Sequence, residues 1–289
     1  MTKLRRTMLF MPGNNPGMLI NAGILGADSV ILDLEDAVSL TEKDSARILV
    51  REAIRNIDYS KVEVVVRINP LDTEFGMKDV DTIARVRPSS IMLPKADENQ
   101  VKELHEALSK IEKEEDFQED SIKIIPIIET AFGLENVYNI IKASKRIVAV
   151  LLGAEDLTAD LGIKRTKEGD EIFYARNKVA TACKALRVDA IDTPFTDTND
   201  YEGLSRDTAK AKSLGMTGKA AINPRQIDTI HSGLAPTEAE IRHAQRILSA
   251  MEEAKREGKG VFSLDGKMVD APIINRAITT MELAKLLGL

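Results

Sequence analysis

The sequence predicts an α/β fold, a (β/α)8 TIM barrel followed by a C-terminal extension made of a hairpin and a helix. Short apolar runs alternate with amphipathic segments along the chain, and eight of these runs have the length and composition of buried strands. Strict alternation of strands and helices favours a parallel sheet, and eight repeats favour closure of that sheet. The 289 residues fit one barrel of roughly 250 residues plus an appendage.

The predicted strands share a core of aliphatic residues, many of them β-branched. They are residues 7–11, 29–34, 62–68, 90–93, 122–128, 147–152, 188–191 and 219–222. Between the strands, apolar residues recur every three or four positions, as in Val101, Leu104 and Leu108, which is the spacing of a helix with one buried face. Asp97, just before that helix, is a candidate N-cap.

The predicted barrel ends with an eighth helix that begins near Thr237, where Glu240 would complete a capping box. This places the barrel domain at residues 1–257. The segment after it has the turn-bounded pattern of a hairpin, and an apolar helix follows. Because a closed barrel does not need this segment, we expect residues 258–289 to form a lid that contacts a neighbouring subunit.

Composition excludes several classes of partner. The chain has 40 basic and 46 acidic residues and a net charge of -6, which disfavours a surface for nucleic acid. No apolar run approaches the ~20 residues that cross a bilayer, and the N-terminus lacks the pattern of a signal peptide. The single cysteine, Cys183, cannot form an internal disulfide. We therefore expect a cytoplasmic protein with no nucleic-acid or membrane partner.

Acidic residues follow the fifth and sixth predicted strands, which are consecutive apolar runs leading to Glu129 and to Asp156. In such a barrel, functional side chains gather at the C-terminal ends of the strands, so both carboxylates should be within reach of one hard cation. Oxygen ligands of this kind suit Mg²⁺. The alternative is a set of ion pairs with Arg67, Lys95 or Arg225 at the same rim, without a metal.

Arg67 lies near the end of the third predicted strand and is a candidate clamp for a substrate carboxylate, because a guanidinium can bind a carboxylate through two parallel hydrogen bonds. The alternative is a salt bridge to Asp33, Glu35 or Asp36. The chain has no dinucleotide-binding or Walker glycine pattern, and its histidines lie in or beside helical segments. The residues alone favour a small carboxylate substrate held on a metal.

Several motifs occur in order along the chain. They are RRTMLFMPG at 5–13, DLEDAV at 33–38, VRINP at 66–70, IET at 128–130, GAED at 153–156, INPRQ at 222–226 and DGKMVD at 265–270. With these motifs the sequence resembles the citrate lyase/malyl-CoA lyase family of Mg²⁺-dependent barrel enzymes, and within it the citrate lyase β subunits. The resemblance extends from the first strand to the C-terminal tail.

The resemblance implies a lyase that cleaves a carbon–carbon bond of a citryl thioester, giving oxaloacetate and an acetyl thioester. It implies that Glu129 and Asp156 ligate Mg²⁺ and that Glu129 and Arg67 contact the substrate. It also implies that Asp270 reaches the site of a neighbouring subunit as the catalytic acid or base.

The resemblance further implies that Pro12, Gly13 and Asn69, at the ends of the first and third strands, bind substrate. Relatives that act on free coenzyme A tend to carry lysines after the first strand, but residues 14–20 include no basic residue. We therefore expect a substrate attached to an acyl carrier subunit, in a citrate lyase complex that also contains an acyltransferase subunit. A homo-oligomer, a trimer or a hexamer, is expected.

Two other functions stay open at this stage. One is a stand-alone lyase for malyl-CoA or citramalyl-CoA, or a malate-synthase-like enzyme that condenses acetyl-CoA with a 2-oxo acid. The other is a non-catalytic, structural subunit of a citrate lyase complex. The presence of Glu129, Asp156, Arg67 and Asp270 argues against the second, because an inactive chain should have lost at least one of them.

Overall fold

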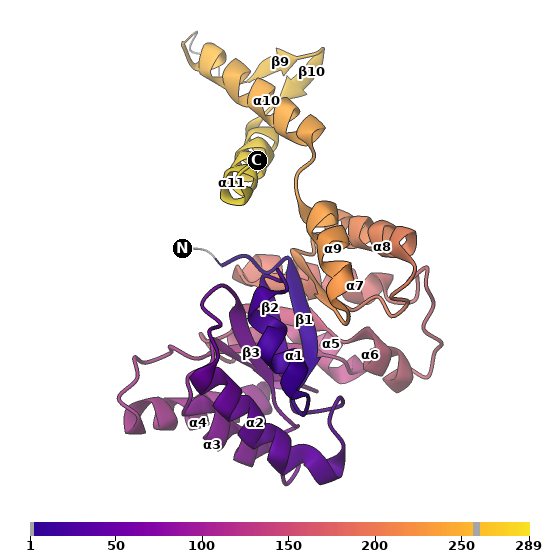
Figure 1. Cartoon of the computed structure of the whole chain (residues 1–289). Helices are drawn as coiled ribbons and strands as arrows, with labels where there is room; N and C mark the ends of the chain where they lie inside the picture. Colours follow the sequence, from indigo (N-terminus) through magenta and orange to yellow (C-terminus); the bar gives the residue numbers. More distant parts are fainter. Residues whose placement is uncertain (1–2, 257–260) are drawn as a thin grey trace. The chain divides into compact units, whose positions relative to one another are not determined.

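Eight parallel strands close into a barrel in sequence order, which confirms the predicted fold (Figure 1). The computed structural model of the chain describes residues 3–256 and 261–289. The barrel strands are β1 (Thr7–Pro12), β2 (Ser29–Asp33), β3 (Glu63–Arg67), β4 (Ser90–Leu93), β5 (Lys123–Ile128), β6 (Ala149–Leu152), β7 (Asp189–Asp192) and β8 (Gly218–Ala221). Each begins within two residues of its predicted start, because unbroken aliphatic runs mark strands that are buried on both faces.

Helices follow the strands around the barrel. They are α1 (Pro16–Asn21), α2 (Lys43–Asn56), α3 (Gly76–Ala84), α4 (Glu98–Glu114), α5 (Ala131–Lys142), α6 (Ala154–Asp160), α7 (Phe173–Leu186), α8 (Tyr201–Ser213) and α9 (Ile227–Leu234), with short 3-10 turns η1 (Ala22–Ile24), η2 (Leu40–Glu42) and η3 (Pro224–Gln226). Asp97 caps α4 as predicted, since its Oδ1 accepts a hydrogen bond of 2.8 Å from Gln100 N.

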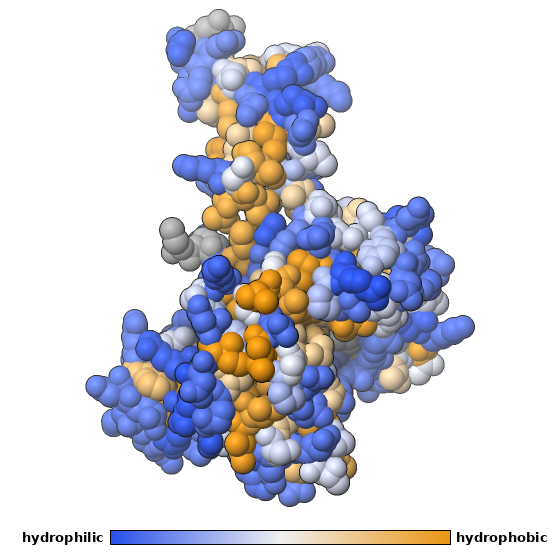
Figure 2. Space-filling model, viewed as in Figure 1, coloured by the Kyte–Doolittle hydropathy of each residue, from blue (hydrophilic) through white to orange (hydrophobic). Residues whose placement is uncertain are grey.

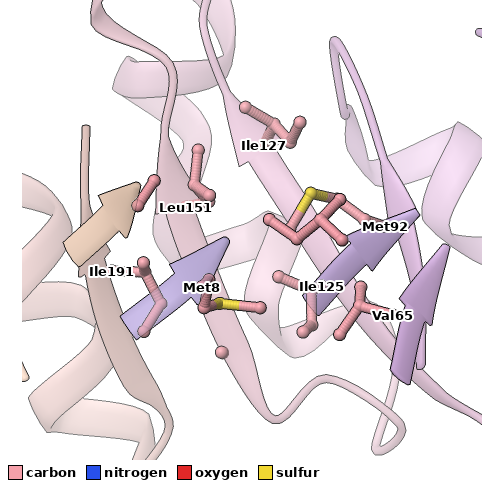
Figure 3. Packing of buried hydrophobic residues seen from close by; sticks show 10 residues of the cluster. Met8, Val65, Met92, Ile125, Ile127, Leu151 and Ile191 are labelled. Carbon is pink, nitrogen blue, oxygen red and sulfur yellow. The ribbon is translucent and has the colours of Figure 1, made fainter. Parts of the chain in front are cut away.

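The interior of the barrel is an apolar core to which every strand contributes (Figure 3). Its buried members are Met8, Ile31, Val65, Met92, Ile125, Ile127, Ala149, Leu151, Ile191 and Ala220. Full burial of one large aliphatic side chain is worth about 1.5–3 kcal/mol. This packed interior holds the strand ends in place and leaves the mouth of the barrel for polar side chains.

The register of β5 and β6 positions the predicted metal ligands. Ile127 pairs with Leu151 and Ile128 with Leu152, and Gly153 N donates to Ile128 O at 3.0 Å. The residues that follow the two strands therefore emerge side by side at the C-terminal rim.

The second compact unit comprises Leu234–Leu289 and contains α10 (Glu238–Arg256), β9 (Phe262–Leu264), β10 (Lys267–Val269) and α11 (Ala271–Leu287). The predicted hairpin and final helix are present. β9 and β10 are antiparallel, and their turn at Asp265 and Gly266 has φ angles of 52° and 74°. Two consecutive positive φ angles suit the tight turn of a two-residue hairpin, which explains the Asp-Gly pair.

Helix α10 belongs to this second unit and not to the barrel, which differs from the sequence prediction. Ala244 and Ile247 of α10 pack with Val269 and Ala277 in one apolar cluster. The helix that follows β8 is instead the short α9, which the sequence analysis missed. The unit boundary thus lies near residue 234, before α10, whereas the predicted boundary at 257/258 falls outside the described residues.

In the face that Figure 2 presents, hydrophilic side chains predominate on both sides of the barrel unit, and hydrophobic side chains form a stripe between them. Within residues 3–256 and 261–289, no helix combines the length and apolar character needed to cross a membrane. Cys183 is buried in α7, as expected for a small core side chain.

Candidate active site

A cavity of about 390 Å³ lies at the C-terminal ends of the barrel strands. It is lined by Phe10, Asp33, Asp36, Ala37, Arg67, Ile127, Glu129, Leu151, Gly153, Ala154, Glu155, Asp156, Thr193, Pro194 and Ile222. Apolar side chains from the barrel core form part of its wall, and charged side chains come from the C-terminal ends of β2 and β3 and from the segments after β2, β5 and β6. This is the place where enzymes with this fold keep their active sites.

Glu129 follows β5 and is only 3 % exposed. Its Oε1 accepts a hydrogen bond of 2.6 Å from the backbone N–H of Lys95, after β4. Burial, together with the nearby carboxylates of Glu35 and Asp156, raises the pKa of the Glu129 carboxyl to about 8 against the lowering effect of the Lys95 N–H. The ionised form of Glu129 therefore lacks a compensating cation in the described part of the chain.

Asp156 lines the same cavity, and its charge is one of those that raise the pKa of Glu129. The structure places it in the first turn of α6 and not at the strand end, because the helix begins directly after Gly153. Acidic side chains are favoured in the first turn of a helix. A Cβ atom on Gly153 would lie 2.7 Å from Glu129 Cβ, so only glycine lets the two strand ends approach this closely.

The structure does not contain the ion pairs that were the alternative to a metal site at Glu129 and Asp156. Within the described ranges, no Lys, Arg or His side chain lies within salt-bridge distance of Glu129 or Asp156. Nor do Lys95 and Arg225 form a salt bridge with either acid. Two neighbouring carboxylates without a cationic partner form a strongly negative point in a partly apolar cavity, and a cation would relieve it.

Arg67 is held by acids of the neighbouring strand, as the salt-bridge alternative predicted. Its Nε and Nη2 donate to the two Asp33 oxygens at 2.7 and 2.6 Å, and Nη1 lies 2.7 Å from Glu35 Oε2 and 3.1 Å from Asp36 Oδ2. The guanidinium also lies over the Phe10 ring, 5.0 Å from its centroid. Arg67 still lines the cavity, so its contact with substrate stays a prediction.

Glu35 is a site residue that the sequence analysis treated only as an ion-pair partner. It is buried, and Oε2 faces Arg67 without the alignment of a hydrogen bond. Burial raises the pKa of the Glu35 carboxyl to about 7, which Arg67 opposes and the charges of Asp36 and Asp33 reinforce. The sequence shows Glu35 in the DLED motif at the end of β2. It does not show that Glu35 lies near Glu129 in the folded chain.

The three other predicted substrate-binding residues, Pro12, Gly13 and Asn69, are not among those that line the cavity. Gly13 N donates to Asp33 O at 2.8 Å, and a Cβ on Gly13 would lie 2.6 Å from that oxygen. Asn69 is buried and donates to Asp79 Oδ2 at 2.7 Å. Asn69 also donates to Leu34 O at 3.0 Å, so that Gly13 and Asn69 support the end of β2. Direct substrate contacts from all three residues stay predictions.

Asp270 lies in the second unit, immediately after β10, where it is the N-cap of α11. Its side chain accepts a hydrogen bond of 3.4 Å from Ile273 N and is half-buried. The predicted role as the acid or base of a neighbouring subunit's site stays a prediction.

The pair of Glu129 and Asp156 fits Mg²⁺. Both ligand groups are hard oxygens, and Mg²⁺ is usually bound through one or two protein carboxylates, with water and substrate completing the shell. Among the described residues, no cluster of three or more His, Cys, Asp or Glu side chains could enclose a metal. A site with two protein ligands leaves positions for a substrate.

Comparison with known proteins agrees with this geometry. The family model described as HpcH/HpaI aldolase/citrate lyase matches residues 6–224. The chain is 46 % identical over 283 residues to citrate lyase subunit beta of Leuconostoc mesenteroides subsp. cremoris, covering 98 % of this chain and 94 % of the relative. It is 32 % identical over 290 residues to mitochondrial citramalyl-CoA lyase of Rattus norvegicus, covering 97 % and 86 %.

Among solved structures, the protein CitE of Mycobacterium tuberculosis, in complex with magnesium, acetoacetate and coenzyme A, is similar with a TM-score of 0.82. It is 30 % identical, and the match covers 98 % of each chain. The family model extends from the start of β1 to the end of β8 and includes the acids at the cavity. This chain therefore belongs to the HpcH/HpaI aldolase/citrate lyase family.

Proposed function

We propose that this protein is a Mg²⁺-dependent carbon–carbon lyase that cleaves a citryl thioester to oxaloacetate and an acetyl thioester. The observation that carries the proposal is the pair of Glu129 and Asp156, side by side in a cavity that Arg67 also lines. Membership of the family and the 46 % identity to a citrate lyase β subunit support the choice of substrate.

Glu129 and Asp156 are the residues that would hold Mg²⁺. When bound, the ion would supply Lewis-acid stabilisation of negative charge on substrate oxygens. The guanidinium of Arg67 would orient a substrate carboxylate. The bidentate pairing of this guanidinium with Asp33 would fix its own orientation. Phe10, Ile127 and Leu151 would exclude water from the apolar part of the cavity.

Cleavage breaks the bond between the carbinol carbon and the methylene carbon next to the thioester. The electron pair of that bond moves onto the thioester, which forms an enolate, while the carbinol gives its hydroxyl proton to a general base and becomes the ketone of oxaloacetate. A carboxylic acid must then protonate the enolate carbon to give the acetyl thioester, and we assign this step to Asp270. Asp270 would act from a neighbouring subunit.

The partners form part of the same proposal. The absence of basic residues from positions 14–20 favours a thioester on an acyl carrier subunit, within a citrate lyase complex that contains an acyltransferase subunit. Exposed apolar side chains at Ile278, Leu286 and Leu289 support a contact of the C-terminal unit with a neighbouring copy. A cytoplasmic location, expected from the composition, completes the proposal.

A comparison of three substrates tests the function. Purified protein with Mg²⁺ should have its highest kcat/KM with citryl-CoA, and lower values with citramalyl-CoA and malyl-CoA. The 32 % identity to a citramalyl-CoA lyase makes that activity the second candidate. A preference for citramalyl-CoA or malyl-CoA would overturn the citryl assignment, and no turnover of any thioester would favour a structural subunit.

Mg²⁺ binding should weaken as the pH falls below about 8, the value to which burial raises the pKa of Glu129. Below that pH the metal must displace a proton from Glu129, so the apparent dissociation constant should rise by about tenfold per pH unit. Titration calorimetry in buffers of different ionisation enthalpy should detect proton release at pH 7 and little at pH 9. An affinity that does not change over this range would contradict the assignment, and Glu129→Gln provides the control.

A further inference from the structure

Lys95 is a cation near the cavity that the mechanism above does not use, although its side chain is not among those that line the cavity. It follows β4, and its backbone N–H binds Glu129 Oε1 at 2.6 Å. The side chain is exposed, and across the part of the chain that the structure describes its Nζ makes no hydrogen bond or salt bridge. Its charge acts on the Glu35 carboxyl, which is 2.7 Å from Arg67. The Lys95 backbone is therefore bound to Glu129, and its ammonium group is uncommitted among the described residues.

The other cations near the reactive acids are already engaged. Arg67, which the proposed mechanism assigns to the first substrate carboxylate, is paired with acids of its own chain through Nε, Nη1 and Nη2. Lys43 is buried and donates to the backbone oxygens of Leu34 and Glu35. Arg225, at the end of β8, contacts Asn223 at 3.4 Å and has no observed link to the reactive acids. Lys95 is thus the best-placed cation for a ligand.

The charge of the cavity creates a need for such a cation. Five carboxylates, Asp33, Asp36, Glu129, Glu155 and Asp156, line it beside the single guanidinium of Arg67. An anionic substrate would be repelled from this surface, even with a divalent cation bound. The need for a further cation that binds the substrate increases with the number of carboxylates on that substrate.

The backbone at Lys95 points to a role for its side chain. Its φ angle is +48°, in the left-handed region, where a residue with a Cβ is strained and glycine is not. The bond from Lys95 N to Glu129 would be available to glycine as well. A long cationic side chain at this position is therefore explained by its charge and not by the backbone geometry.

We propose that Lys95 binds the second free carboxylate of the citryl group and thereby sets the preference for citryl over citramalyl and malyl thioesters. This inference rests on the proposed function. A citryl thioester has two free carboxylates, one on the carbinol carbon and one on a methylene arm. Citramalyl and malyl thioesters have only the first. An ammonium group at the rim distinguishes them because it gains an ion pair with the citryl group alone.

The test compares substrates in matched variants. Lys95→Met should lower kcat/KM for citryl-CoA by about tenfold or more, the usual effect of a lost charged hydrogen bond, and change that for citramalyl-CoA by less than about twofold. Lys95→Arg should retain the preference, and Arg225→Gln, which removes a cation from the same rim, should leave it unchanged. Equal losses on both substrates, or no loss on either, would overturn the proposal.

A binding measurement separates this inference from the proposed function. With Mg²⁺ present, calorimetry on Lys95→Met should show about tenfold weaker binding of oxaloacetate and unchanged binding of pyruvate, which lacks the second carboxylate. Lys95→Gly, which relieves the strained φ angle, should behave in the same way if the methionine variant folds poorly. Turnover of citryl-CoA by the unmodified protein tests the proposed function separately. If that turnover is observed but the Lys95 variants keep the substrate preference, only the role of Lys95 is wrong.

Discussion

Replacement of Asp156 by alanine should abolish Mg²⁺-dependent turnover and leave the barrel folded. Asp156 is exposed on the first turn of α6 and forms no salt bridge in the described parts of the chain, so its removal costs no packing. The replacement would remove one of the two proposed protein ligands of Mg²⁺. The electrostatic contribution of the metal in such sites is several kcal/mol. We expect kcat/KM to fall by about 10²-fold or more.

Glu155→Ala is the matched control, because Glu155 lies in the same helical turn and lines the same cavity. Its carboxylate is 3.5 Å from Arg165 Nε, at an exposed position where an ion pair contributes little. Steady-state rates over a range of Mg²⁺ concentrations should therefore change little for Glu155→Ala. Circular dichroism and thermal unfolding should be alike for both variants. An Asp156→Ala enzyme with an undiminished rate would eliminate the metal site.

Replacement of Asp270 by asparagine should reduce turnover by about 10²-fold or more if this carboxyl transfers the proton to carbon. Asparagine is as good an N-cap as aspartate, so α11 should keep its start and the variant its stability. Mg²⁺ binding should be unaffected, since the proposed ligands are in the barrel unit. A variant that retains the full rate would remove Asp270 from the mechanism.

Mixed oligomers test whether the site is shared between subunits. Chains with Asp156→Ala lack a metal ligand, and chains with Asp270→Asn lack the acid, so each alone should be inactive. Co-assembly should restore part of the activity if one chain's barrel can receive the other's Asp270. A mixture of Asp156→Ala with Glu129→Gln should stay inactive, because both changes damage the barrel site. Failure of the first mixture would place Asp270 in its own chain's site or outside catalysis.

The fold was predictable because its signals are local. Unbroken aliphatic runs such as 147–152 identify strands buried on both faces, and their alternation with amphipathic segments implies a parallel barrel. The hairpin turn at Asp265 and Gly266 was recognisable for the same reason, since two consecutive positive φ angles favour that pair of residues. The assignment of α10 was wrong because the helical pattern does not reveal which core a helix joins.

The sequence by itself determined the barrel, the metal-ligand candidates Glu129 and Asp156, and the family, since each depends on residue types and their order. Only the tertiary structure decided how these groups are paired. The Arg67 guanidinium is engaged by Asp33, Glu35 and Asp36, while Lys95 has no such partner. Pairing depends on distances across neighbouring strands, which burial and register set and which the linear order of residues does not contain.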